Sequence, residues 1–293
     1  MRDIRSCYYE VDVGEPLKYR NRSGNERLIN AVEITDRHAV LLIDDRPVKL
    51  ELGHLRDPSK SNPPGEMLHI VDIGGLTVGL EATRECLIEN VYEETTLNLK
   101  KDVRLFIREK AISPPLSYTF PTPAYDWNYG DNWMTKTPYG FHLGIDLYAS
   151  RGSDVVAVCD GIIQDVRFYD PSIDVEDYWG MMVSILGDDG VIYNYMHFDR
   201  LAPGIQPGKR IRGGEYMGPV GKSGFESMPY GPHLHFEMMM LRKPELFRFV
   251  FLENLGQPHI PLRVLPYDTE GFVVNPLLYL NEWYGKLLYK RED

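Results

Sequence analysis

Short β-forming runs, each closed by a glycine- or proline-rich turn, follow one another along most of the 293 residues. After residue 140 the rhythm is clearest. It runs through SDVVAVCDGIIQDVRFYD, WGMMVSILGDDGVIYNYMHF, PGIQPGKRIRGGEYMGPVGKSG and PHLHFEMMM, with a GDDG turn inside the second segment. Two β runs joined by such a turn are typical of a hairpin. The sequence therefore predicts an antiparallel β-sheet domain in this part of the chain.

A second set of β-like runs lies earlier, between residues 27 and 108, and includes HAVLLI, LTVGLEA and VRLFIRE. The stretch AISPPLSYTFPTPAYDWNYGDNW follows it, and its prolines exclude regular strand ladders there. We expect a mainly β protein in which a small β domain precedes the larger sheet domain. The predicted parts are an N-terminal β domain of unknown role at 1–110, a Pro/aromatic-rich linker at 111–139, and the sheet domain at 140–293, with insertions near 168–179 and 241–270.

The formal net charge of −11 provides no basic surface for a phosphate backbone, so nucleic acid is not the expected partner. No stretch approaches the roughly 18 apolar residues that a membrane span needs, and the N-terminus lacks the apolar core of a signal peptide. A protein that stays inside the cell and one whose signal has been removed both fit this pattern. The sequence therefore leaves the compartment open.

The chain contains three cysteines, Cys7, Cys86 and Cys159, which are far apart and form no CxxC pair. This spacing predicts neither a disulfide framework nor a thiolate metal site.

Three short motifs gather the side chains best suited to bind a metal. They are HLGID, from His142 to Asp146, YMH, which ends at His197, and HLH, which carries His233 and His235. Alternate residues of a strand share a face, so both histidines of HLH point the same way. In HLGID the glycine permits either a tight bend or a close approach of another chain segment. Zinc takes imidazole nitrogens and carboxylate oxygens in catalytic sites with three protein ligands.

A metal site of two histidines and one carboxylate uses only three of these five side chains. His197 and one histidine of HLH are then not needed as ligands. Such histidines can take a proton from metal-bound water and stabilise developing charge. The other histidines lie outside these spacings and are expected to be structural. They are His38, His54, His69 and His259.

In this order, HLGID, YMH and GPHLHFE resemble the lysostaphin/LytM-type zinc metallopeptidases, best known as peptidoglycan endopeptidases. FP precedes the motifs, PVGKSG stands just before the last of them, and NPLLYL follows. The resemblance covers roughly Phe120 to Leu280. It implies an antiparallel sheet that opens a groove with the metal at its floor.

Position by position, the resemblance makes His142, Asp146 and His235 the ligands of Zn²⁺. It makes His197 and His233 the catalytic histidines. The family also uses a tyrosine near the first motif to stabilise the tetrahedral intermediate. We expect Tyr129 of YGD in this role, with Tyr139 of PYGFH as the alternative.

The function implied is that of a zinc-dependent endopeptidase hydrolysing peptide bonds in peptidoglycan cross-links or stem peptides, with extracellular or cell-wall action. One alternative is a non-catalytic wall-binding or regulatory member of the same fold, against which the five intact site residues argue. Another is a phosphocarrier with two facing histidines, a site that has no use for His142 and Asp146.

Overall fold

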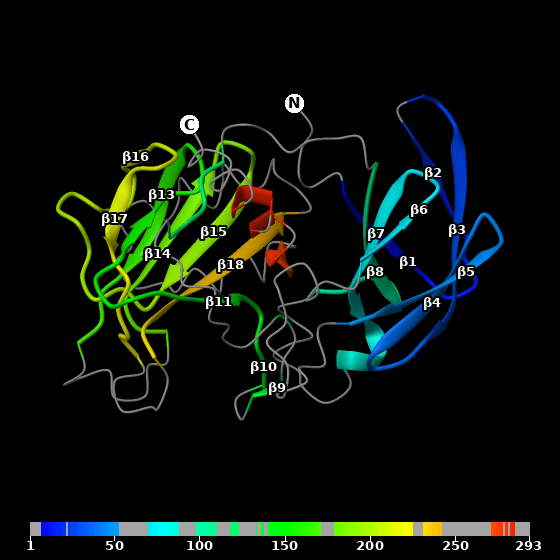
Figure 1. The fold of residues 1–293 in the computed structure, drawn as a ribbon, viewed down its shortest axis with the longest axis horizontal. Helices are drawn as coiled ribbons and strands as arrows, with labels where there is room; N and C mark the ends of the chain where they lie inside the picture. Colours follow the sequence, from blue (N-terminus) through cyan, green and yellow to red (C-terminus); the bar gives the residue numbers. More distant parts are fainter. Residues whose placement is uncertain are drawn as a thin grey trace. The chain divides into compact units, whose positions relative to one another are not determined.

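In the computed structural model of the chain, antiparallel strands dominate and confirm the mainly β prediction (Figure 1). The described residues are 7–21, 23–52, 70–87, 98–109, 118–122, 133, 136–137, 140–170, 179–224, 231–241, 271–277, 279–280 and 282–284. The chain divides into two compact units, one of Met1–Pro114 with Trp133–His142 and the other of Pro115–Asn132 with Leu143–Asp293. The predicted domain boundaries and linker remain predictions. Most of the two predicted insertions lies outside the described residues.

The first unit contains two four-stranded antiparallel sheets, with strand orders β1-β8-β7-β6 and β2-β3-β4-β5. The strands of the first sheet are β1 (Tyr8–Val11), β6 (Ile70–Ile73), β7 (Leu76–Thr83) and β8 (Val103–Glu109), and η3 (Arg84–Leu87) is a 3-10 turn after β7. Those of the second are β2 (Leu17–Arg20), β3 (Glu26–Ile34), β4 (His38–Ile43) and β5 (Arg46–Glu51). Strand β4 alternates strictly, with Ala39, Leu41 and Ile43 buried, as expected for a strand with one face on a core.

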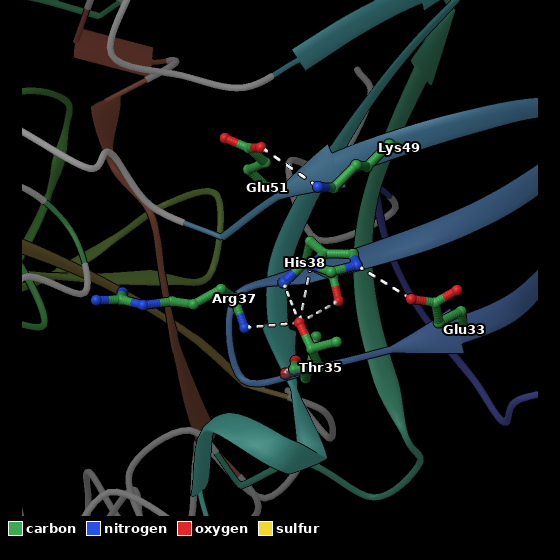
Figure 2. Close-up of polar contacts among 7 residues, drawn as sticks. Glu33, Thr35, Arg37, His38, Lys49 and Glu51 are labelled. Atoms are coloured by element: carbon green, nitrogen blue, oxygen red, sulfur yellow. Dashed lines mark hydrogen bonds and ion pairs between the residues drawn. The ribbon is translucent and has the colours of Figure 1, made fainter.

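The turn between β3 and β4 is built around Thr35 and His38 (Figure 2). Thr35 Oγ1 accepts hydrogen bonds from the backbone N–H groups of Arg37 and His38 and lies 2.9 Å from His38 Nδ1. The other ring nitrogen of His38 lies 3.3 Å from Glu33 Oε1. Both ring nitrogens therefore serve local structure, in agreement with the structural role expected for this histidine.

The second unit is organised on a seven-stranded sheet of order β11-β18-β15-β14-β13-β16, with β19 pairing β18. Its strands are β11 (Ile145–Tyr148), β13 (Gly161–Arg167), β14 (Met182–Gly187), β15 (Val191–Met196), β16 (Arg210–Ile211), β18 (His233–Leu241) and β19 (Gly271–Val274). A two-stranded ladder in the same unit pairs β12 (Asp154–Val156) with β17 (Tyr216–Pro219). A second such ladder, β9 (Lys136–Thr137) with β10 (Gly140–Phe141), belongs to the segment Trp133–His142 that groups with the first unit. The GDDG turn joins β14 to β15 as predicted, with a 2.8 Å hydrogen bond from Gly190 N to Gly187 O.

The two faces of this sheet differ in chemistry. On one face Tyr193, Phe236 and Trp283 pack together, and Trp283 also stacks on Tyr118 with ring centroids 5.2 Å apart. Residues one position along these strands face the other way. That opposite face carries Asn194 and His235, both buried. The core face thus anchors the strands while the polar face holds the candidate site.

Candidate active site

The metal-ligating side chains meet where β11 pairs with β18. Asp146 of β11 lies directly opposite His235 of β18, and Asp146 Oδ1 is 2.9 Å from His235 Nδ1. One ligand atom from each of His142, Asp146 and His235 lies within 4.8 Å of the others. Two imidazoles and one carboxylate suit a tetrahedral zinc whose fourth position stays open for water. The three residues that the resemblance assigns as ligands are therefore brought together.

Gly144 lies between the two ligands of the HLGID motif. A Cβ atom at Gly144 would stand 2.5 Å from His235 Nε2 and 2.8 Å from the backbone oxygen of Phe236, closer than real Cβ atoms come. Its φ is not among the positive values found in the described residues, so no left-handed bend requires glycine here. Of the two readings of this glycine, close approach is the one that the structure supports.

His197 and His233 share one hydrogen-bonding pattern. His197 Nδ1 is 2.9 Å from the backbone oxygen of Ser223, and His233 Nδ1 is 2.8 Å from that of Gly231. A carbonyl oxygen only accepts hydrogen bonds, so Nδ1 carries the proton in both rings and donates it. Each ring is therefore left with Nε2, and not Nδ1, for other partners.

Both rings lie beside the ligand cluster. The His197 centroid is 4.8 Å from that of His233 and 5.9 Å from that of His235. His233 Nε2 is 3.8 Å from Asp146 Oδ1. Burial, reinforced by the neighbouring His233 and His235, holds the pKa of His197 well below its ordinary value, so this ring is neutral near neutral pH.

His197 has a positive φ of 70°, which is uncommon outside glycine. It follows the last residue of β15, and this backbone geometry places it beside the PVGKSG turn that supplies the Ser223 carbonyl. The same serine accepts a 2.8 Å hydrogen bond at Oγ from Met181 N. Gly180 leaves room for this turn, because a Cβ there would lie 2.1 Å from Ser223 O. The PVGKSG turn is thus a support for His197.

The predicted tyrosines Tyr129 and Tyr139 lie outside the described residues, as do His54, His69 and His259. Tyr148 does contact one of the assisting histidines: it is paired with His233 across β11 and β18, and their ring centroids are 5.1 Å apart. Sequence reasoning also missed Glu237, whose Oε1 lies 3.0 Å from His235 Nε2. The period of two in HLHFE was the available signal, since residues 233, 235 and 237 share one face.

An antiparallel sheet that gathers a His–Asp–His donor set, with two more histidines beside it, has the side chains of a metal-dependent hydrolase. The comparison with known families agrees, because residues 140–245 match peptidase family M23. The match confirms the predicted resemblance of this part of the chain to the lysostaphin/LytM-type peptidases.

Two relatives show the extent of the similarity. An L-Ala--D-Glu endopeptidase of Bacillus subtilis is 26% identical over 129 residues, which cover 41% of this chain and 37% of that protein. The glycyl-glycine endopeptidase ALE-1 of Staphylococcus capitis is 28% identical over 140 residues, covering 41% of this chain and 34% of that protein. The matched region spans about a third of the length of these relatives.

Among solved structures, lysostaphin of Staphylococcus simulans aligns with a TM-score of 0.39 at 18% identity, covering 58% of this chain and 56% of that one. The description of the fold therefore rests on the strand pairing of this chain itself. Within the described residues, helices long and apolar enough to cross a bilayer are absent.

Proposed function

We propose that the chain is a zinc-dependent endopeptidase in which His142, Asp146 and His235 hold the metal and His197 and His233 assist hydrolysis. The observation that carries the proposal is the placement of two histidines, each with Nδ1–H donated to a backbone carbonyl, beside a His–Asp–His cluster. Histidines with a purely structural role would not be expected to lie beside three potential ligands with the same nitrogen, Nδ1, protonated in both rings. A hydrolytic site needs such groups as base and charge stabiliser.

The donor set supports zinc as the ion, because two imidazole nitrogens and one carboxylate oxygen match the three protein ligands of a catalytic zinc site. When bound, Zn²⁺ would supply Lewis-acid polarisation of the scissile carbonyl and a water whose pKa falls to about 7.

The two assisting histidines would have different roles: one accepts a proton, and the other stabilises negative charge. His197 is held neutral by burial, so its Nε2 is ready to accept a proton from the attacking water. His233 Nε2, 3.8 Å from Asp146 Oδ1, would take up a second proton and donate it as a hydrogen bond to the oxygen that becomes negative in the tetrahedral intermediate. The backbone bonds at Nδ1 would hold both rings in the productive orientation throughout.

The substrate that we propose is a peptide bond in peptidoglycan cross-links or stem peptides, with action outside the cell or at the wall. The support is the naming of the two relatives as L-Ala--D-Glu and glycyl-glycine endopeptidases, which both act on bonds between small or acidic residues.

The test combines metal analysis with digestion. The purified chain should contain about one zinc per molecule and should release peptides from purified peptidoglycan or cleave pentaglycine. Activity should vanish with a chelator and return with zinc, while the His233→Ala variant serves as the catalytically impaired control. A protein that binds zinc but cleaves neither substrate would support the non-catalytic alternative and overturn the proposed endopeptidase.

A further inference from the structure

A row of three buried polar side chains crosses the sheet beside the ligand His235. Ser184 of β14 is paired with Asn194 of β15, and Asn194 is paired with Glu237 of β18. Directly opposite residues of neighbouring strands point to the same face, so the three side chains form one line. Ser184 is 0% exposed, Asn194 4% and Glu237 2%, so all three side chains are shielded from bulk solvent.

Hydrogen bonds link this row from end to end. Ser184 Oγ donates to Asn194 Oδ1 at 2.5 Å, and Asn194 Nδ2 donates to Glu237 Oε2 at 3.2 Å. The other carboxylate oxygen, Glu237 Oε1, lies 3.0 Å from His235 Nε2. The ionised Glu237 carboxylate only accepts hydrogen bonds, so the Asn194 amide must turn its N–H group toward Glu237 and its oxygen toward the serine hydroxyl, which can donate.

This polarity decides the state of the His235 ring. An ionised carboxylate only accepts hydrogen bonds, so Nε2 of His235 must carry a proton and donate it to Glu237. The opposite nitrogen, Nδ1, lies among the ligand atoms, 2.9 Å from Asp146 Oδ1, so it is the nitrogen at which a metal would replace a proton. This is the reverse of His197 and His233, whose Nδ1 atoms carry the proton.

A fully buried glutamate is expensive unless its partners compensate for the lost water, and apolar residues of similar size would usually serve stability as well. The sheet nevertheless buries two further polar residues, Asn194 and Ser184, in the hydrogen-bonded row that ends at Glu237. Such an arrangement is expected where the ring of a metal ligand must be fixed, because ligand histidines usually donate their second nitrogen to a carboxylate or carbonyl.

We propose that Glu237, held by Asn194 and Ser184, is a positioning residue that fixes the tautomer and orientation of His235 so that Nδ1 faces the metal. This inference rests on the proposed function for the ligand role of His235. It concerns how the ligand is prepared and not the chemistry of the peptide bond.

The experiment measures zinc affinity by competition with a chromophoric chelator, without any peptide substrate. Glu237→Leu, which removes the acceptor, should weaken zinc binding about 10- to 100-fold. Glu237→Gln retains an amide oxygen that can accept from Nε2, so it should recover part of this loss. Asp189→Asn is the matched control, because Asp189 accepts hydrogen bonds from Tyr118 and Tyr193. Both tyrosines pack against Trp283 on the core face of the sheet, opposite the face that carries His235. The zinc affinity of Asp189→Asn should equal that of the wild type.

Nitrogen-15 NMR of the zinc-loaded chain provides a readout that general destabilisation would not produce. The wild type should show His235 protonated at Nε2, and His197 and His233 protonated at Nδ1 as internal references. In Glu237→Leu only the His235 pattern should change. If that variant does not fold, Asn194→Ala replaces it, with a smaller loss of affinity expected.

The outcomes separate this inference from the proposed function. Wild-type affinity and an unchanged His235 tautomer in Glu237→Leu, or in Asn194→Ala where it replaces that variant, would overturn the positioning role and leave the endopeptidase intact. A wild type that binds zinc, loses it in these variants and cleaves no peptide would overturn the endopeptidase alone. A wild type that binds no zinc would overturn both.

Discussion

Asp146 and His235 face each other across β11 and β18, with Asp146 Oδ1 2.9 Å from His235 Nδ1, although 89 positions separate them in the chain. The distance between these two potential ligands is set by the register in which the two strands pair. The pairing of β11 with β18 is therefore what assembles the site.

The first prediction concerns the ligands. Replacing His142, Asp146 or His235 with Ala should lower zinc occupancy, because two remaining protein ligands cannot hold the ion against buffer. Metal analysis after gel filtration measures this, and His38→Ala is the control, since His38 serves only a turn in the first unit. Full occupancy in all three ligand variants would contradict the assignment.

The second prediction separates ligands from catalytic groups. His197→Ala and His233→Ala should keep their zinc and lose turnover by on the order of 100-fold or more, as expected when an acid–base or charge-stabilising group is removed. Both zinc content and kcat are measured on the same samples. Loss of zinc in His197→Ala would mean that ligand and base have been exchanged.

The third prediction uses the crowding at Gly144. Gly144→Ala should weaken zinc binding, because the new methyl group must displace the His235 ring or the backbone of Phe236. Gly231→Ala is a matched control on the other side of the site, since its Cβ would meet only the Tyr148 ring at 3.5 Å, an ordinary contact. Equal zinc affinity in the two variants would show that the His235 ring can shift away from the new methyl group without weakening metal binding.

Much of this site followed from local patterns. The alternation in HLHFE places His233 and His235 on one face, and the GDDG turn predicts the hairpin of β14 and β15. The resemblance supplied the order of the motifs. It also drew attention to the PVGKSG turn, without indicating that its Ser223 carbonyl holds His197.

What the sequence could not show depends on contacts across the sheet. The pairing of Asn194 with Glu237 joins residues 43 positions apart, and no local period encodes which strands become neighbours. The two readings of Gly144 likewise stayed open, because only the position of β18 shows that His235 fills the space beside it. Tautomers follow from these distant partners and are equally invisible in the sequence.

The fourth prediction is a pH dependence of zinc binding. Burial alone lowers the pKa of His235, but hydrogen bonds to Asp146 and Glu237 outweigh it and raise the pKa to about 9 in the metal-free protein. This value exceeds the ordinary 6.5, so the proton stabilises the metal-free fold fully below about pH 6.5, and the stabilisation is lost as the pH rises through about 9. Zinc must displace that proton from Nδ1.

Zinc affinity should therefore rise by roughly tenfold per pH unit between about pH 7 and 9, with about one proton released per zinc. Calorimetry in two buffers of different ionisation enthalpy measures the release. Binding that is independent of pH over this range would show that His235 is neutral before the metal arrives.

The fifth prediction addresses the first unit, where Arg104 and Glu10 form a buried ion pair of 2.7 Å with side chains 1% and 10% exposed. Removing Glu10 leaves the Arg104 charge buried without its carboxylate, so Glu10→Ala should lower the free energy of unfolding by about 3–5 kcal/mol. Glu26→Ala is the control, because its partner Arg20 is 4.0 Å away with both side chains largely exposed, and the expected change is at most about 1 kcal/mol. Urea denaturation measures both variants.

The double replacement Glu10→Leu with Arg104→Met should recover much of the lost stability, since well-packed apolar residues often replace a buried pair without net cost. If Glu10→Ala instead unfolds at the same urea concentration as Glu26→Ala, the pair is accessible to water in solution. Zinc content should remain at the wild-type level in all these variants, because the altered residues lie on β1, β3 and β8, and none of these strands carries one of the three candidate ligands.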